Sequence, residues 1–84
     1  MKVNSDKLIY FCDNKRHLVC LPYNIPNLHR MAKELSISRW WFHKGKDGKS
    51  HYDIPKRRIE EITKKCEVIS SKDILRIIKG IKIE

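Results

Sequence analysis

The stretch Lys7-Leu-Ile-Tyr-Phe-Cys-Asp-Asn-Lys-Arg-His-Leu-Val-Cys-Leu21 contains two short apolar runs separated by a polar interruption. Their aromatic and β-branched residues predict two buried strands, over residues 7–12 and 17–21, and Pro22 ends the second. The link over residues 13–16 is too short for a parallel crossover, which needs about a dozen residues or more. We therefore expect an antiparallel hairpin.

A helix is predicted directly after this hairpin, in the best-marked segment of the chain. Asn24 is a favoured N-cap residue, and Pro26 suits the first helical turn. The inward face then repeats at helical spacing, and the helix is expected to end near Ser36. The residues of that face are Ile25, Leu28, His29, Ala32 and Leu35.

Weaker signals organise the second half of the chain. Residues 40–42 predict a short strand, Pro55 opens a second helix, and residues 66–69 predict another strand. Ser70 begins an S-x-x-D capping box for a last helix, which ends at Gly80.

The order of these elements predicts a small α/β fold. Short strands interspersed with helices suit a three- or four-stranded mixed sheet covered by about three helices. The length predicts one domain over residues 1–84, with a core at about residues 7–79 and frayed termini. Because so small a core leaves stability marginal, homodimerisation is one expected way of adding to it.

The charge of the chain is strongly positive and unevenly distributed. The net charge is +9, and residues 43–58 carry six basic and two acidic side chains in sixteen positions. Such a basic patch raises the local concentration of anions, which predicts nucleic acid or a nucleotide as the partner. The alternative is that the lysines only keep a small protein in solution.

The composition also bears on compartment. No apolar run approaches the ~18 residues that span a bilayer, and the start of the chain lacks the apolar region of a secretory signal. An odd number of cysteines without clustered spacing is a poor disulfide framework. We therefore expect a cytoplasmic protein without membrane contact, in which Cys12, Cys20 and Cys66 are small buried residues.

His51 and Asp53 are candidate catalytic residues. In an extended segment they project to the same side, so the imidazole and the carboxylate can act as a base and its orienting group. The alternative for Asp53 is a helix cap, because it lies two residues before Pro55.

Asp13 and His29 are two further catalytic candidates. Asp13 ends the first predicted strand, and ligands gather at strand carboxyl ends in open α/β sheets. The alternative is an ordinary turn aspartate. His29 lies on the inward side of the first helix, where a hydrogen-bonded core histidine is the alternative to a ligand.

Candidate ligand-binding residues surround these positions. Arg39 next to Trp40 offers a cation beside an aromatic surface, as in base-stacking platforms. Two adjacent tryptophans cannot both face the core of an extended segment, so one of Trp40 and Trp41 should be exposed. Tyr52 is either a stacking surface or a core residue. The glycine-bearing loop between Phe42 and Tyr52 carries lysines that can contact phosphate, and these are Lys44, Lys46 and Lys49.

The sequence does not predict a structural metal or any other cofactor. It contains no C-x2-C or H-x3-H pair, the spacing by which structural zinc sites are recognised. A weakly held divalent cation at Asp13, His51 and Asp53 is the alternative to a metal-free protein.

Three segments resemble one family. His29-Arg-Met-Ala-Lys-Glu-Leu, Arg39-Trp-Trp-Phe-His and His51-Tyr-Asp-Ile follow one another in the order and spacing typical of the DUF4031 family, short bacterial and phage proteins of unknown function. The resemblance covers about residues 10–78. It implies that the following positions belong together: Asp13, His29, Arg39, His51, Tyr52 and Asp53.

The resemblance has two departures and supplies no activity. The loop after the first strand, residues 14–16, is shorter than is usual in the family, and the loop over residues 45–49 is longer. Both departures fall at the rim of the candidate site.

Three functional hypotheses follow from the sequence. The first is a module that binds a phosphate-rich ligand in a cleft around Arg39, His51 and Asp53. The second is a small hydrolase or transferase for a phosphoryl or glycosidic bond, in which the side chains of Asp13, His29, His51 and Asp53 converge. The third is a phage or plasmid accessory protein that binds a host protein through Trp40 or Trp41. Whether the chain is an enzyme stays open at this stage.

Overall fold

The predicted hairpin forms the middle of the sheet. In a computed structural model, which describes residues 7–45 and 48–80, β1 (Ile9–Cys12) pairs antiparallel with β2 (His17–Leu21). Arg16 closes the turn between them with a φ of 71°, in the left-handed region. Arg16 makes two hydrogen bonds to the backbone of Ile54. Ile54 N donates to Arg16 O at 2.8 Å, and the Arg16 guanidinium donates to Ile54 O at 3.1 Å.

The described residues form a five-stranded mixed sheet in the order β3-β4-β2-β1-β5. The added strands are β3 (Phe42–His43), β4 (His51–Asp53) and β5 (Glu67–Val68), and of the four strand pairs only β1–β5 is parallel. The α/β class is therefore confirmed. The sheet exceeds the predicted three or four strands because the extended segment His51-Tyr-Asp53 inserts as a strand between β2 and β3.

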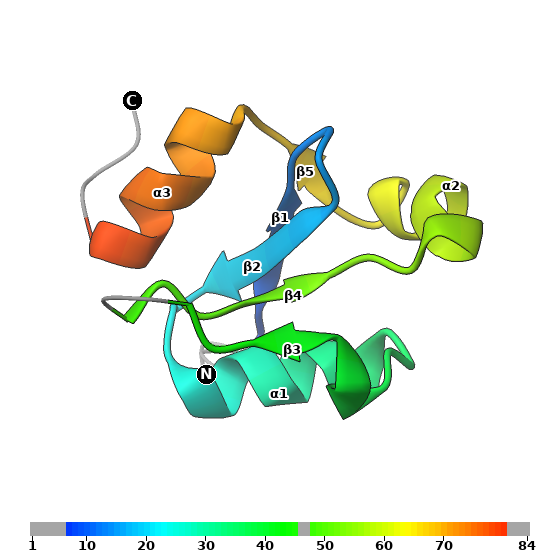
Figure 1. Ribbon diagram of the computed structural model, residues 1–84, viewed down its shortest axis with the longest axis horizontal. Helices are drawn as coiled ribbons and strands as arrows, with labels where there is room; N and C mark the ends of the chain where they lie inside the picture. The colour runs from blue at the N-terminus through cyan, green and yellow to red at the C-terminus, as the bar shows by residue number, and fades with distance from the viewer. Residues whose placement is uncertain (1–6, 46–47, 81–84) are drawn as a thin grey trace, which may run out of the picture.

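Two helices cover opposite faces of this sheet (Figure 1). α1 (Ile25–Glu34) packs on the face that carries Tyr52, and α3 (Ser71–Lys79) packs on the other. Both predicted N-caps are present: Asn24 accepts a hydrogen bond from Asn27 N at 2.8 Å, and Ser70 from Asp73 N at 3.1 Å. Gly80 ends α3 with a φ of 77°, which favours glycine.

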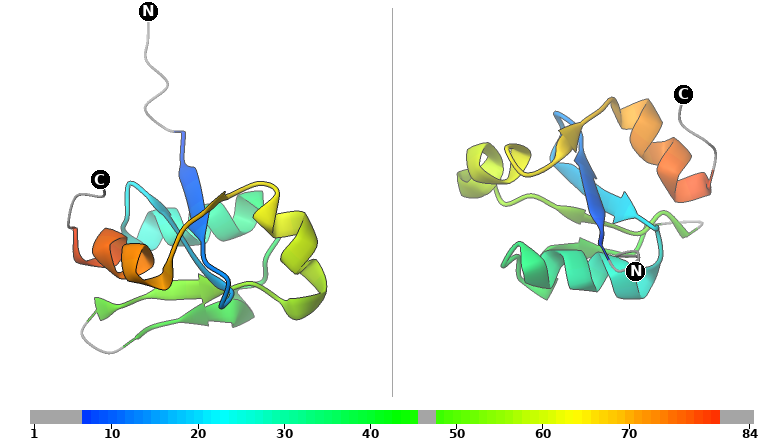
Figure 2. Two further views of the ribbon diagram at one scale, coloured as in Figure 1. Left: turned by 90° about the horizontal axis from the view of Figure 1, so that it is seen from above. Right: turned by 180° about the vertical axis from the view of Figure 1, so that it is seen from behind.

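Short helical turns replace regular structure at two places. Residues 39–41 form a 3-10 turn, η1 (Arg39–Trp41), where a strand was expected, so the strand begins only at Phe42. After Pro55 the chain forms η3 (Lys56–Arg58) and then α2 (Ile59–Thr63). α2 and α3 lie at opposite ends of the molecule's long axis (Figure 1 and Figure 2).

The core lies on both faces of the sheet, under the helices. Tyr52 is the largest of its fully buried side chains, with 1 % exposed, so it is a core residue. The buried hydrophobic residues are Leu8, Cys12, Leu18, Val19, Cys20, Leu28, Met31, Ala32, Leu35, Ile37, Tyr52, Ile54, Ile62, Ile74 and Ile77. No helix within residues 7–45 and 48–80 is long and apolar enough to cross a membrane.

Candidate functional site

Strand register gathers three histidines and an aspartate on the face of the sheet that α3 covers. His17 pairs with Asp53 across β2–β4, and His43 pairs with His51 across β3–β4. Residues directly opposite one another share a face, as do residues two apart in a strand. The cluster therefore follows from pairing between segments that lie far apart in the sequence. We call it, together with Asp13, the histidine–aspartate cluster: Asp13, His17, His43, His51 and Asp53.

Asp13 is buried at the end of β1, with 2 % exposed, and four groups donate to its carboxylate. One oxygen, Oδ1, accepts from the backbone N–H of Lys15 and of His17, both at 2.9 Å. The other, Oδ2, lies 2.6 Å from Ser71 Oγ and 2.8 Å from His17 Nδ1. Burial alone would raise the pKa of Asp13, but these hydrogen bonds outweigh it and lower the pKa below its ordinary value.

These contacts fix the tautomer of His17. An ionised carboxylate can only accept hydrogen bonds, so the Nδ1 of His17 must carry the proton that joins it to Asp13. The Nε2 of the neutral ring then carries a free lone pair. Asp13 is thus a turn residue, as in its alternative interpretation, and it also orients His17, which the sequence analysis did not single out.

His51 is held in the same way by a different acceptor. Its Nδ1 lies 3.0 Å from the carbonyl oxygen of Lys49, which again places the proton on Nδ1. Its Nε2 lies 3.4 Å from Asp53 Oδ1, while Nε2 of His43 lies 3.0 Å from Asp53 Oδ2. The carboxylate of Asp53 therefore lies between two imidazoles. The 3-10 turn after Pro55 has no side-chain cap, so Asp53 is not a helix cap.

The rings of the cluster are in close contact. His17 meets His51 edge to face with ring centroids 5.0 Å apart, and His43 stacks on His51 with centroids 5.5 Å apart. One ring nitrogen of His17, one of His51 and a carboxylate oxygen of Asp53 all lie within 4.8 Å of one another. These three are the residues that could hold a metal ion.

A cavity of about 300 Å³ opens beside the cluster. His17 and His51 lie at its edge, Lys49 and Gly45 line its rim, and α3 forms a mainly apolar wall. The wall residues from α3 are Ser71, Ile74, Leu75 and Ile78. A bound molecule in this cavity would lie against both imidazoles.

The opposite face of the sheet holds a second set of predicted residues. Nδ1 of His29 lies 2.7 Å from the Tyr52 hydroxyl, and its ring contacts Phe42 with centroids 4.7 Å apart. Burial lowers the pKa of His29, and the charge of Arg39 lowers it further. Burial raises the pKa of Tyr52, which the charge of Arg39 partly offsets.

The structure brings His51 and Asp53 together, and it joins Asp13 to them through His17, whose ring contacts His51. It places His29 elsewhere. Because Tyr52 alternates with its neighbours along β4, it and His29 lie on the α1 side, where Arg39 acts on both. The cleft expected around Arg39, His51 and Asp53 is not formed for the same reason. His29 is the hydrogen-bonded structural histidine that was its alternative reading.

The remaining ligand-binding candidates are scattered. Trp40 is 82 % exposed, whereas Trp41 is half-buried and packs against the core, as expected for one tryptophan of the pair. Lys44 is exposed, and Lys49 lines the cavity. Lys46 lies outside the described residues.

Sequence reasoning missed His17, His43 and Ser71. His17 had a usable signal, since it lies four residues after Asp13 across a short hairpin turn. The place of His43 in the cluster depends on the β3–β4 register, and that of Ser71 depends on how α3 packs on the sheet. Neither feature is encoded in a local sequence pattern.

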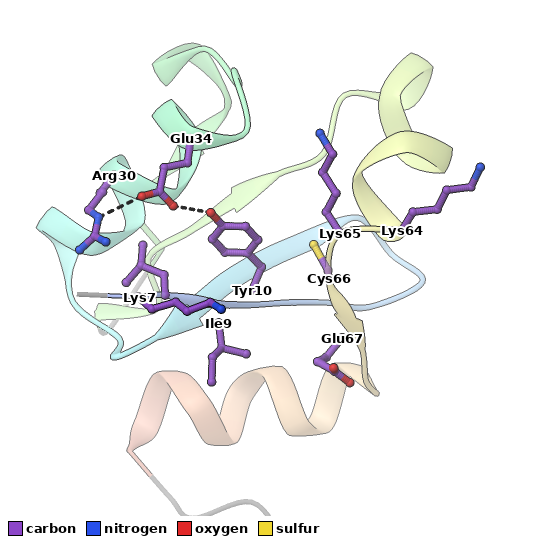
Figure 3. Close-up of a pocket in the computed structure, with 10 residues that line it drawn as sticks. Lys7, Ile9, Tyr10, Arg30, Glu34, Lys64, Lys65, Cys66 and Glu67 are labelled. Atoms are coloured by element: carbon purple, nitrogen blue, oxygen red, sulfur yellow. Dashed lines mark hydrogen bonds and ion pairs between the residues drawn. The ribbon is translucent and has the colours of Figure 1, made fainter. Parts of the chain in front are cut away.

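A larger hollow of about 630 Å³ lies on the α1 side, between α1 and the start of β5 (Figure 3). Three of its polar side chains are engaged with one another, because Glu34 accepts from the Tyr10 hydroxyl and pairs with Arg30 at 3.1 Å. Although larger, it brings together no set of groups comparable to the histidine–aspartate cluster.

Comparison with known protein families identifies the family of the chain. The family model described as "Protein of unknown function (DUF4031)" matches residues 14–80. The chain belongs to this family. No curated protein and no solved structure gives a significant match. Because the DUF4031 description carries no activity, the function of this DUF4031 chain has to be argued from the cluster itself.

Proposed function

We propose that this DUF4031 protein is a hydrolase or transferase that acts at a phosphoryl bond, with the histidine–aspartate cluster as its reaction centre. The observation that carries the proposal is the buried Asp13, which orients His17 onto the face where His51 and Asp53 lie. A carboxylate that fixes one tautomer of an imidazole beside a second imidazole is the arrangement that proton transfer requires.

The hydrogen bonds to the Asp13 carboxylate exceed what a turn residue requires. Burying a charged carboxylate is unfavourable, and here four donors are arranged to compensate it. A turn aspartate needs only the two backbone donors, so the contacts to His17 and Ser71 go beyond the needs of the turn. They support a role in holding His17 in one orientation.

Charge favours a phosphate ester as the substrate. The net charge of +9 attracts anions, and Lys49 lines the cavity together with His17 and His51. Glycosidic chemistry usually needs two carboxyl groups free to act on the substrate. Asp13 is occupied by four donors, which leaves Asp53 alone and disfavours a glycosidic bond.

In the proposed reaction, water or another hydroxyl group attacks the phosphorus atom of the substrate. The new oxygen–phosphorus bond forms while the bond to the leaving oxygen breaks. The proton of the attacking group passes to the cluster, and the leaving oxygen takes up a proton. Positioned proton transfer of this kind contributes about 10²–10⁴-fold to a rate.

The test is hydrolysis of bis(p-nitrophenyl) phosphate by the purified chain and by four variants. We expect Asp13→Asn, His17→Gln and His51→Gln to lose roughly 100-fold in rate. His29→Gln is the matched control on the opposite face and should keep the rate. Far-ultraviolet circular dichroism checks that each variant is folded. No hydrolysis by the native chain, or equal rates for His51→Gln and His29→Gln, would contradict the proposal.

A second candidate is binding of nucleic acid without turnover. It is favoured by the exposed Trp40 beside Arg39 and by the basic residues 43–58. Binding of a single-stranded oligonucleotide should then weaken steeply with added salt and fall in Trp40→Ala. A host protein that docks on Trp40 is the alternative use of this side chain, and Trp40→Ala would weaken that complex without any steep salt dependence.

A further inference from the structure

We propose that the cluster binds a divalent transition-metal cation of the zinc class through Nε2 of His17, Nε2 of His51 and the carboxylate of Asp53. One ligand atom from each residue lies within 4.8 Å of the other two. The proposal names the cofactor of the proposed reaction centre. It rests on the proposed function for the cation's catalytic role alone, in which the bound cation would replace the two free imidazole nitrogens in activating the attacking water. Binding itself can be measured without a substrate.

The first argument is the state of His17. Its Nδ1 is committed to Asp13, and among residues 7–45 and 48–80 no hydrogen-bond partner meets its Nε2. A carboxylate that accepts from the far nitrogen is the usual second partner of a metal-binding histidine, because it fixes the tautomer and raises the basicity of the other nitrogen. Asp13 has this relation to His17.

The second argument is that His51 is prepared in the same way. Its Nδ1 faces the carbonyl oxygen of Lys49 at 3.0 Å, the other common partner of metal-binding histidines. Both imidazoles thus have their outer nitrogen tied to an acceptor and their inner nitrogen left for a cation.

The third argument is distance. Two ligands at about 2.1 Å from a tetrahedral Zn²⁺ stand about 3.4 Å apart. Nε2 of His51 and Oδ1 of Asp53 already lie 3.4 Å apart. The ligand atoms of all three residues lie within 4.8 Å of one another. His17 therefore has to approach the other two by at most about 1.4 Å, the difference between 4.8 and 3.4 Å, to reach the same ligand separation.

Simple ion pairing explains less of the arrangement. A bridge from Asp53 to His43 and His51 accounts for those three side chains. It does not account for the orientation of His17 by a buried carboxylate and Ser71, since His17 makes no hydrogen bond to Asp53 among the described contacts. A cation explains both halves of the cluster.

The ligand set selects the class of cation. Imidazole nitrogens suit zinc and its neighbours, whereas Mg²⁺ and Ca²⁺ prefer oxygen ligands. Three protein ligands leave a fourth position, as in catalytic zinc sites. His17 and His51 both border the 300 Å³ cavity, so the cluster lies where a substrate in that cavity can reach it.

The experiment is calorimetric titration of the chelator-treated 84-residue chain with ZnSO₄. We expect one equivalent to bind. His51→Gln and Asp53→Asn, which each remove a ligand, should weaken zinc binding at least 100-fold. Asp13→Asn, which removes the partner of His17 and not a ligand, should weaken it by about 10–100-fold. His29→Gln is the matched histidine control and should bind as the native chain does. Because these substitutions are conservative and lie at different positions, one variant that fails to fold leaves the others to decide.

Separate outcomes decide the two proposals. Failure to bind one equivalent of zinc, or equal weakening by His29→Gln and His51→Gln, would overturn the cation site. Hydrolysis that persists unchanged in the chelator-treated chain would overturn the cation's catalytic role, while leaving the proposed function in place. Stoichiometric zinc binding without hydrolysis under any of these conditions would leave the site standing and overturn the function.

Discussion

At the scale of single residues, Asp13 determines what its neighbours can do. Two backbone N–H groups would satisfy it as a turn residue, yet Ser71 and His17 also donate to it. Ser71 is the first residue of α3, so the same carboxylate joins the hairpin turn, the imidazole and the helix. The position of α3 and the orientation of His17 are therefore coupled through one side chain.

The cysteines give a prediction at the same scale. Burial raises the pKa of Cys20 to about 11 and that of Cys66 to about 12, and it also raises the pKa of Cys12. Because the folded protein holds these protons more tightly than the unfolded chain does, all three groups stay as thiols when the pH rises through 9. Cys12 and Cys20 are buried as expected, whereas Cys66 is only partly buried and lines the hollow of Figure 3. A disulfide reagent such as Ellman's should therefore leave Cys12 and Cys20 unmodified at about pH 8 in the native protein, react slowly with Cys66, and react with all three in guanidinium chloride.

The rate gives the control for this prediction. Modification of Cys12 and Cys20 should proceed no faster than global unfolding, and it should speed up in a destabilised variant such as Leu28→Ala. Rapid labelling of either of these two buried residues would show that their surroundings open more easily than the structure indicates.

At the scale of elements, the sequence predicts those parts that local signals encode. The hairpin, the start of α1 at Asn24 and the capping of α3 by Ser70 follow from turn length, periodicity and cap chemistry, and all are present. The neighbours of His51 and Asp53 depend instead on which strands pair and in which register. His29 is the clearest failure, because its helical position says nothing about which face of the sheet the helix covers.

The β3–β4 turn offers a prediction about how His51 is held. A Cβ on Gly45 would lie 2.5 Å from the carbonyl oxygen of Lys49, the group that accepts from His51 Nδ1. Gly45→Ala must therefore displace that carbonyl and loosen the ring. We expect zinc affinity to fall by about tenfold, in the range typical of lost second partners, as measured by calorimetry.

Gly48→Asn is the matched control for this turn. Gly48 has a φ of 75°, which asparagine tolerates, and nothing lies within 4 Å of its added Cβ. This variant should bind zinc as the native chain does. Equal losses in the two variants would mean that the turn affects the site through general strain and not through the Lys49 carbonyl.

Arg58 gives a second prediction at the scale of elements, because it closes the end of α1. Its guanidinium donates to Ser36 O at 2.7 Å and to Leu35 O at 2.8 Å, and it pairs with Glu61. Arg58→Ala leaves those carbonyls without a donor, so the free energy of unfolding should fall by roughly 1–2 kcal/mol in urea denaturation. Arg57→Ala, at an exposed neighbour, should change it by less than about 0.5 kcal/mol.

The same contact has a consequence for pH. The hydrogen bond from Arg58 lowers the pKa of Glu61 to about 2. A folded-state pKa below the unfolded one means that the stabilisation is present above about pH 4.5 and is lost as the pH falls toward 2. In Arg58→Ala, an NMR titration of the Glu61 carboxyl should show the pKa back in its ordinary range. A pKa that stays near 2 would assign the shift to Lys65 instead.

At the scale of the whole molecule, the sheet separates two environments that the sequence interleaves. His51, Tyr52 and Asp53 are consecutive, yet the first and third face α3 and the cavity, while Tyr52 faces α1 and His29. We infer that the α3 side carries the chemistry and that the α1 side carries packing.

Tyr52→Phe tests this division, because it changes the middle residue of the His-Tyr-Asp strand. The variant loses the 2.7 Å contact between the hydroxyl and His29 and keeps the buried ring, so stability should fall by about 0.5–1.5 kcal/mol in urea denaturation. Zinc affinity and hydrolysis should stay at their native values. His51→Gln should show the reverse pattern, with a large loss of zinc affinity and little change in stability. If Tyr52→Phe lowered zinc affinity as much as His51→Gln does, the two faces of the sheet would be coupled through β4. The assignment of chemistry to the α3 side and of packing to the α1 side would then be wrong.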